Sequence, residues 1–228
     1  RLSDYQLVRL NANLPSLDLS AAYPLLFKPL LEKTALNNAD MAGEASLKLH
    51  MDNSELKSFE LRLNDVDVAD KQQKFAFYKV NANIPWSYDA AKNISFGYEN
   101  GSLLNLPLGK TSIKAELNRF ALTAPNIRLP ILDGALSLSN ISAARIAGAW
   151  FWHLSAKLEP ISMEDFSRSL RLPSMSGKVS AEIPLVTYSA GNLTTDGSMV
   201  LNIFSGTATV TGLTMQNPLG VAPKLNAD

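Results

Sequence analysis

The chain has 228 residues, with 21 basic and 21 acidic side chains and no net charge at pH 7. This balance argues against nucleic-acid binding, because such surfaces carry an excess of lysine and arginine. The chain has no cysteine, which excludes disulfides and thiolate chemistry, and no apolar run approaches the roughly 18 residues of a membrane-spanning helix.

The first hundred residues alternate between apolar and polar side chains, which is typical of strands with one buried and one exposed face. Strands are expected within residues 5–19, from 43 to 51 and around Leu61. Val66 and Val68 continue the third strand with a shift of one residue. That shift predicts a β-bulge or a tight turn.

Two segments favour short helices. Residues 19–33 are helix-like, but Pro29 predicts a short or kinked helix because proline removes a backbone hydrogen bond and clashes with the preceding turn. Residues 161–170 carry apolar side chains three and four positions apart, and Ser162 is the expected N-cap.

Each helix-like segment precedes a similar strand. Met41-Ala-Gly-Glu-Ala-Ser and Met175-Ser-Gly-Lys-Val-Ser share the pattern Met-small-Gly-charged-apolar-Ser, with Gly43 and Gly177 as their glycines. This long-range repeat predicts a unit of several strands and one helix used twice, over about residues 1–125 and 126–228. We expect both units to belong to one segment of a longer protein, because the sequence opens and closes without obvious terminal signals.

Short strands with turns about every ten residues follow between the two repeats, and they predict an antiparallel all-β fold. Asn100-Gly101 is the strongest hairpin-turn signal in the chain. Residues 147–158 form the most aromatic of the expected strands, with Trp152 and Leu154 on one of its faces.

Residues 166–185 combine the end of the second helix-like segment, a leucine-proline step and the strand that contains Gly177 and Val179. This combination resembles the C-terminal region of YdbH-type AsmA-like proteins, and the resemblance extends over about residues 130–220. Three further segments resemble the same family: 132–138, 192–201 and 204–210.

This resemblance implies an elongated, highly curved antiparallel sheet that forms an open apolar groove, with one or two short helices. It implies a lipid-transfer bridge in the periplasm of a Gram-negative bacterium, anchored in the inner membrane, that passes phospholipid or fatty-acyl chains toward the outer membrane. A small outer-membrane lipoprotein that adds a strand to a sheet edge is the implied protein partner. The alternating residues expected to line the groove are Leu47, Leu49, Leu61, Leu136, Leu138, Trp152, Leu154, Val179, Ala181, Ile183, Met199, Leu201, Ile203 and Val210.

Other functions remain open as alternatives. The same alternation would suit a closed β-sandwich that serves as a scaffold or an adhesin-type protein-binding module. A carbohydrate-active β fold would need two carboxylates at a defined separation. His50 and His153 are the only histidines, and neither lies in a triad or zinc-ligand pattern. We therefore expect no enzyme, no metal and no cofactor.

Overall fold

The structure is a computed structural model that describes residues 9–31, 34–189, 191–203, 206–212, 214–216 and 224–226. The chain divides into two compact units. Unit 1 comprises residues 1–104 and 112–119, and unit 2 comprises residues 105–111 and 120–228. The boundary predicted near residue 125 lies shortly after the last residue of unit 1.

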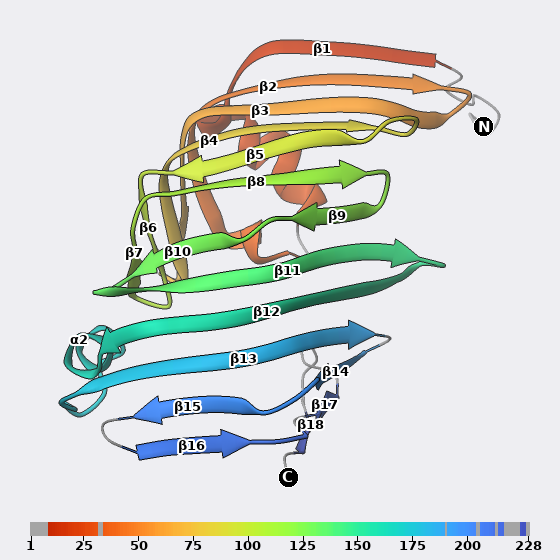
Figure 1. The fold of residues 1–228 in the computed structure, drawn as a ribbon. Coiled ribbons are helices and arrows are strands. Elements are labelled where there is room, and N and C mark those ends of the chain that lie inside the picture. Colours follow the sequence, from red (N-terminus) through yellow and green to blue (C-terminus); the bar gives the residue numbers. More distant parts are fainter. Residues whose placement is uncertain are drawn as a thin grey trace. The chain divides into compact units, whose positions relative to one another are not determined.

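Unit 1 is an antiparallel sheet whose long strands follow one another in chain order. β1 pairs with β2, β2 with β3, β3 with β4, and β4 with both β5 and β6, while β5 pairs with β8. The strands are β1 (Arg9–Asp18), β2 (Ala39–Asp52), β3 (Glu55–Asp70), β4 (Phe75–Ser87), β5 (Lys92–Tyr98), β6 (Asn100–Leu103) and β8 (Thr111–Asn118). Figure 1 shows β1 to β5 side by side and strongly curved.

A broken helical segment connects β1 to β2. It comprises α1 (Leu19–Ala22), a π turn η1 (Tyr23–Phe27) and two 3₁₀ turns, η2 (Lys28–Leu30) and η3 (Ala35–Asn38). Asp18 caps α1, because its carboxylate accepts from the Ser20 backbone N–H at 2.9 Å. The α-helix proper ends before the two prolines of this segment, which confirms the prediction of a short, interrupted helix.

Unit 2 is also built of curved antiparallel strands, with one helix. Its long strands β11, β12 and β13 pair in order, and the outer strands extend the sheet on both sides. The strands are β7 (Leu106–Leu108), β9 (Ala121–Ala124), β10 (Ile127–Ile131), β11 (Gly134–Ile146), β12 (Ala149–Ser162), β13 (Lys178–Ser189), β14 (Asn192–Thr195), β15 (Met199–Ile203), β16 (Gly206–Val210), β17 (Thr214–Gln216) and β18 (Lys224–Asn226). The helix α2 (Met163–Ser169) connects β12 to β13 at one end of these strands (Figure 1).

The antiparallel all-β prediction with short helices is therefore confirmed. In unit 1 a helical segment, rather than a second sheet, lies over the apolar face, so the closed-sandwich expectation does not describe this unit. Within the described part of the chain, no helix is long and apolar enough to cross a membrane.

The predicted bulge at Val66 is confirmed. The β3–β4 register shifts between Leu63 and Val66, and Asp65 adopts a positive φ of 47°. The two residues Asp65 and Val66 stand opposite the single residue Gly43, because Ala42 pairs with Asp67 and Glu44 pairs with Asn64. Val66 is thereby turned into the interior and is fully buried.

The hairpin turn predicted at Asn100-Gly101 is wrong. Both residues lie in β6. β5 and β6 both pair with β4, so the chain continues along β4 after an interruption at Glu99 and does not turn back. Gly101 is needed for close approach: a Cβ there would lie 2.7 Å from the Ala76 carbonyl oxygen. A strand glycine that approaches another backbone has the same local sequence signal as a turn glycine.

Candidate functional site

Apolar residues of unit 1 form rows that cross several strands on one face of the sheet. Residues paired directly in antiparallel strands lie on the same face, and the register pairs Leu14 with Leu47, Leu47 with Leu61, and Leu61 with Ile84. Two flanking rows share this face, and they are Leu17–Ala45–Leu63–Ala82–Phe96 and Ala12–Leu49–Phe59–Trp86. The predicted groove residues Leu47, Leu49 and Leu61 therefore lie together.

A cavity of about 520 Å³ lies between this face and the helical segment. Its lining is apolar throughout, apart from the phenol of Tyr23. The lining residues are Leu19, Tyr23, Phe27, Leu31, Leu36, Met41, Ala45, Leu61, Leu63, Val66, Val68, Phe75, Phe77, Val80 and Phe96. Of the predicted groove residues, only Leu61 is among them.

The one polar lining group is already satisfied. The Tyr23 hydroxyl donates a hydrogen bond to the Leu36 backbone carbonyl, which connects η1 to η3. Burial raises the pKa of Tyr23, and the negative charge of Asp40 adds to that rise. The phenol therefore stays neutral, and the cavity offers a ligand apolar contact without a specific polar anchor.

Most of the cavity lining was missed by sequence reasoning. The bulge at Val66 moves the rows on β3 and β4, so that Phe75 and Phe77 come to line the same cavity as Leu63. The spacing of Phe75 and Phe77, two positions apart in one expected strand, was the available signal. It marks an apolar face but not which residues of distant strands share a cavity.

Unit 2 repeats the arrangement of apolar rows. One row is Leu129–Leu136–Leu158–Ala181–Leu201–Ala208, and its neighbours are Ile127–Leu138–Ala156–Ile183 and Ile161–Val179–Ile203. Along β12 the same face continues through Leu154 to Trp152, which stacks on Tyr188 at 5.4 Å between ring centroids. Met199 and Val210 pair on the face of Leu201. All eleven predicted groove residues of unit 2 therefore lie on one face.

Helix α2 covers one end of that face. Ile161, Met163 and Val179 form a buried cluster, and Phe166, Leu201 and Ile203 pack against it. Val179 is thus a core residue at this end, and the half-buried Leu201 and Ile203 pack against it, whereas Trp152 and Leu154 lie toward the other end of β12. The prediction that all these positions line one open groove did not include helix α2, which covers this end of the face.

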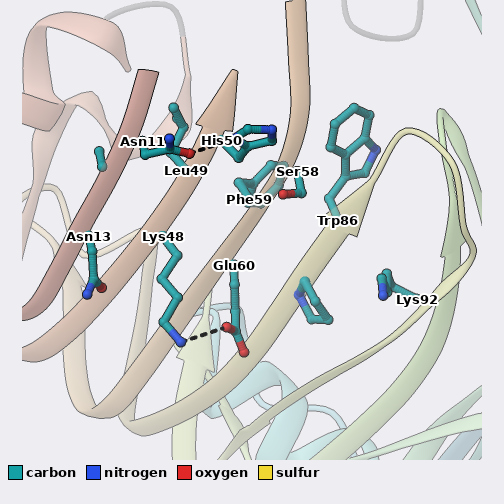
Figure 2. Close-up of a pocket in the computed structure, with 12 residues that line it drawn as sticks. Asn11, Asn13, Lys48, Leu49, His50, Ser58, Phe59, Glu60, Trp86 and Lys92 are labelled. Carbon is teal, nitrogen blue, oxygen red and sulfur yellow. Dashed lines mark hydrogen bonds and ion pairs between the residues drawn. The ribbon is translucent and has the colours of Figure 1, made fainter. Parts of the chain in front are cut away.

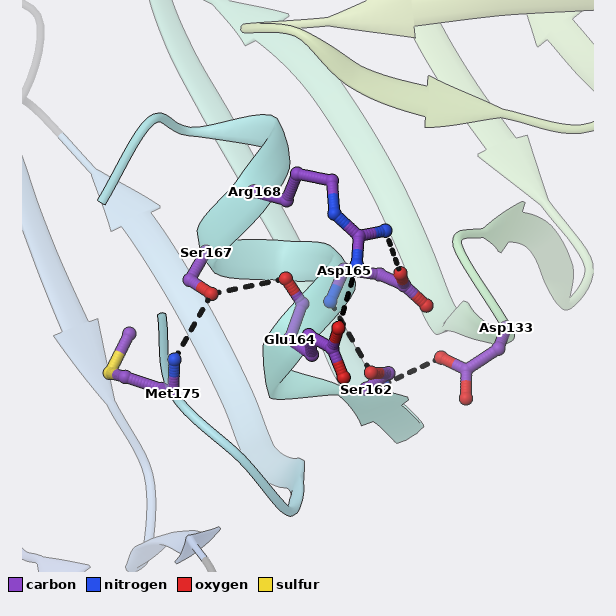
Figure 3. A network of polar contacts seen from close by, with 7 residues as sticks. All are labelled: Asp133, Ser162, Glu164, Asp165, Ser167, Arg168 and Met175. Atoms are coloured by element: carbon purple, nitrogen blue, oxygen red, sulfur yellow. Dashed lines mark hydrogen bonds and ion pairs between the residues drawn. The ribbon is translucent and has the colours of Figure 1, made fainter. Parts of the chain in front are cut away.

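Polar contacts fix α2 in place, as Figure 3 shows. The Ser162 hydroxyl accepts from the Asp165 N–H at 3.3 Å, which confirms the predicted N-cap. The buried Ser167 hydroxyl donates to the Glu164 carbonyl at 3.0 Å and accepts from the Met175 N–H at 3.4 Å, so the chain after the helix is held against it. Arg168 pairs with Glu164 and Asp165, each at 2.8 Å.

Asp133 connects this helix start to the β10–β11 turn. Its carboxylate accepts from the Ser162 N–H at 2.6 Å and pairs with Lys178 at 3.4 Å. The hydrogen bond from Ser162 lowers the pKa of Asp133, and Lys178 contributes to the same shift.

The pH dependence of the free energy of unfolding should report the lowered pKa of Asp133. A pKa that is lowered on folding stabilises the fold above the unfolded-state value of about 3.9, and the contribution is lost as the pH falls through the folded-state value. We expect Asp133→Asn to unfold at lower urea concentration than the wild type at pH 7, with the difference shrinking toward pH 3. A difference that stayed constant with pH would contradict the assignment.

A second hollow of about 580 Å³ in unit 1 has a mixed lining, in which polar side chains stand beside the apolar row of Ala12, Leu49, Phe59 and Trp86 (Figure 2). Four of its polar side chains pair with one another. Lys48 pairs with Glu60 at 3.6 Å, and His50 Nδ1 donates to Asn11 Oδ1 at 2.5 Å. The hydrogen bond from Arg62 lowers the pKa of Glu60, which keeps this carboxylate ionised. The hollow joins an ion pair to part of an apolar row, and we assign it no ligand.

The described residues contain no metal-binding cluster. No group of three or more His, Asp or Glu side chains there lies close enough to hold a metal ion. His153 lies in β12 between Ser142 and Thr187 of the neighbouring strands. Among the described residues, the apolar faces and above all the unit 1 cavity suit a ligand.

The resemblance to YdbH-type AsmA-like proteins rests on strand motifs of small residues. It stays a prediction. Comparison with protein-family models, with curated proteins and with solved structures finds no match, so the function is argued from the geometry of the apolar faces.

Proposed function

We propose that the protein binds the acyl chains of phospholipids or fatty acids against its apolar sheet faces and shields them from water during transfer between membranes. The observation that carries this proposal is the unit 1 cavity, whose fifteen lining residues present no unsatisfied polar group. Its volume of about 520 Å³ falls within the range of about 300–1,000 Å³ that small-molecule sites occupy.

The physical chemistry of an acyl chain matches such a lining. Each CH₂ removed from water contributes about 0.8 kcal/mol, without any need for directed polar contacts. Rows of similar side chains offer many sites of nearly equal affinity. An acyl chain that moves along the protein needs such sites, because a single tight site would hold it in place. A polar head group would stay at the water-exposed rim.

The cellular setting is part of the same proposal. The resemblance over residues 130–220 supports a periplasmic bridge segment in the Gram-negative envelope, in a protein that is anchored to the inner membrane. It also supports a small lipoprotein partner that adds a strand at a sheet edge. β1 suits such an addition, because its described pairing is with β2 on one side only. The proposed role is binding and transfer, not catalysis.

Mass spectrometry of solvent extracts tests the proposal directly. We expect phospholipid or fatty acid in stoichiometric amount from the purified protein and none from a buffer blank. A protein purified free of lipid should bind a fluorescent fatty acid in a saturable way. Monomeric, folded protein that yields a clean extract and takes up no lipid on soaking would instead favour the scaffold or adhesin alternative.

A further inference from the structure

Three large apolar side chains are exposed at one end of unit 2, with Trp150 on the face of Arg145 and Ile146 on the opposite face of the hairpin. Ile146 is 60% exposed, Trp150 is 52% exposed and Phe120 is 56% exposed. Ile146 and Trp150 flank the β11–β12 hairpin turn, and the Arg145 N–H donates to the Phe120 carbonyl at 3.0 Å, which brings β9 beside them. We call Phe120, Ile146 and Trp150 the apolar tip.

The turn between these residues projects into open space. Ile146 pairs with Ala149, so Ala147 and Gly148 close the hairpin, with φ values of 49° and 84°. A Cβ on Gly148 would meet no atom within 4 Å. A surface that approached this end would therefore meet the turn and its flanking apolar side chains first.

The one Lys or Arg side chain at this end of the hairpin is Arg145. Residues 142–155 contain no acidic side chain, and Lys157 lies toward the α2 end of β12, between Ser137 and Glu182. Arg145 pairs with Trp150 across the hairpin and therefore lies on the same face. An exposed tryptophan beside an arginine matches the boundary between head groups and acyl chains, where aromatic rings and cations both interact favourably.

The tip also ends the apolar face of unit 2. Trp150, Trp152 and Leu154 alternate along β12 and share that face, and α2 covers the opposite end of the same strand. Figure 1 shows the hairpin and α2 at opposite ends of β12. An acyl chain that entered at the tip would meet the uncovered part of the face directly.

We propose that the apolar tip docks unit 2 onto a lipid bilayer with anionic head groups, where acyl chains pass between the bilayer and the apolar face. This inference deepens the proposed function and rests on it for the passage of acyl chains. The docking itself depends on the three exposed side chains and on Arg145. Burial of exposed apolar side chains at the interface and attraction of a cation to anionic lipid both favour it.

Vesicle co-sedimentation tests the docking with the whole chain. We expect binding to vesicles of phosphatidylethanolamine with phosphatidylglycerol, and about tenfold weaker binding of the double variant Ile146→Ser, Trp150→Ser. Leu104→Ser is the matched control, because Leu104 is 57% exposed but lies in unit 1, and it should bind like the wild type. Arg145→Gln should weaken binding about fivefold on anionic vesicles and leave binding to phosphatidylcholine vesicles unchanged.

Tryptophan fluorescence gives a second readout. Of the three tryptophans, Trp86 is buried and Trp150 is the exposed one at the tip. Anionic vesicles should shift the emission to the blue, and bromine-labelled lipids should quench it, whereas Trp150→Phe should remove most of both effects and still co-sediment.

Three outcomes would overturn the docking inference. Two of them are a wild type that does not bind vesicles and a folded double variant that binds them as well as the wild type does. The third is a change in oligomeric state in the double variant by sedimentation velocity, which would assign the tip to contact with a second copy. Fatty-acid uptake in solution tests the proposed function separately, so uptake without vesicle binding would reject the docking alone.

Discussion

Leu61→Asp is expected to empty the unit 1 cavity of bound acyl chain. Leu61 lies in the central row of the apolar face and lines the cavity without being fully buried. An ionised carboxylate there would have to lose its hydration when an acyl chain enters, and such a group costs several kcal/mol to bury without a partner. We expect at least a tenfold loss of affinity for a fluorescent fatty acid, because about 1.4 kcal/mol already corresponds to tenfold.

The matched control places the same charge on the opposite face. Ser46 pairs with Arg62 on the polar side of β2 and β3, so Ser46→Asp adds a carboxylate beside a cation. This variant should bind the fatty acid like the wild type. Circular dichroism and thermal unfolding must show that both variants are folded. Equal affinities in two folded variants would contradict the assignment of the cavity as the acyl-chain site.

Leu61 is a better test position than the predicted groove residue Val179. Val179 is 8% exposed and belongs to the cluster beneath α2. A charge there would destabilise the core of unit 2, and a loss of binding would then report unfolding. The pairing register therefore changes which of the alternating residues can test the function.

The fold class could be predicted from the sequence because the strands carry a clear period of two. Alternation at Leu47, Leu61 and Ile183 requires one apolar and one polar face, and Ser162 marked the start of α2 correctly. The shift of phase at Val66 marked the bulge. These signals are local, so a sequence alone carries them.

The cavity could not be predicted, because it depends on which distant residues meet. Phe27 and Phe96 lie far apart in the sequence and line the same cavity once the sheet curves and the helical segment crosses it. Alternation shows that each strand has two faces, but it does not show which other segment of the chain packs on either face. The failed turn at Asn100-Gly101 has a similar cause, since only the neighbouring backbone shows that Gly101 is needed for close approach.

Gly43→Ala is expected to destabilise unit 1 by about 3 kcal/mol or more. Gly43 has a φ of 119°, where a Cβ is disfavoured by about 1–2 kcal/mol. A Cβ would also lie 2.8 Å from both the Asp65 carbonyl oxygen and the Val66 Cα. Both contacts are with backbone of the β3 bulge, so relief would require β2 and β3 to separate where they pair.

Gly197→Ala separates the two causes of this effect. Gly197 has a similarly positive φ of 98°, but its nearest neighbours are side-chain atoms of Pro184 at 3.5 and 3.6 Å. Only the backbone strain should act there, with a loss of about 1–2 kcal/mol. Urea unfolding of both variants measures the difference, and equal losses would show that the bulge can move to accept a methyl group.

The bulge also connects this glycine to the proposed ligand site. Val66 lines the cavity because Asp65 and Val66 together face the single residue Gly43. An alanine that pushed β3 away would displace Val66 from the cavity wall, so the fatty-acid affinity of folded Gly43→Ala should fall while that of Gly197→Ala stays unchanged. If acyl chains bind elsewhere, Gly43→Ala should lose stability and keep its full affinity for the fatty acid.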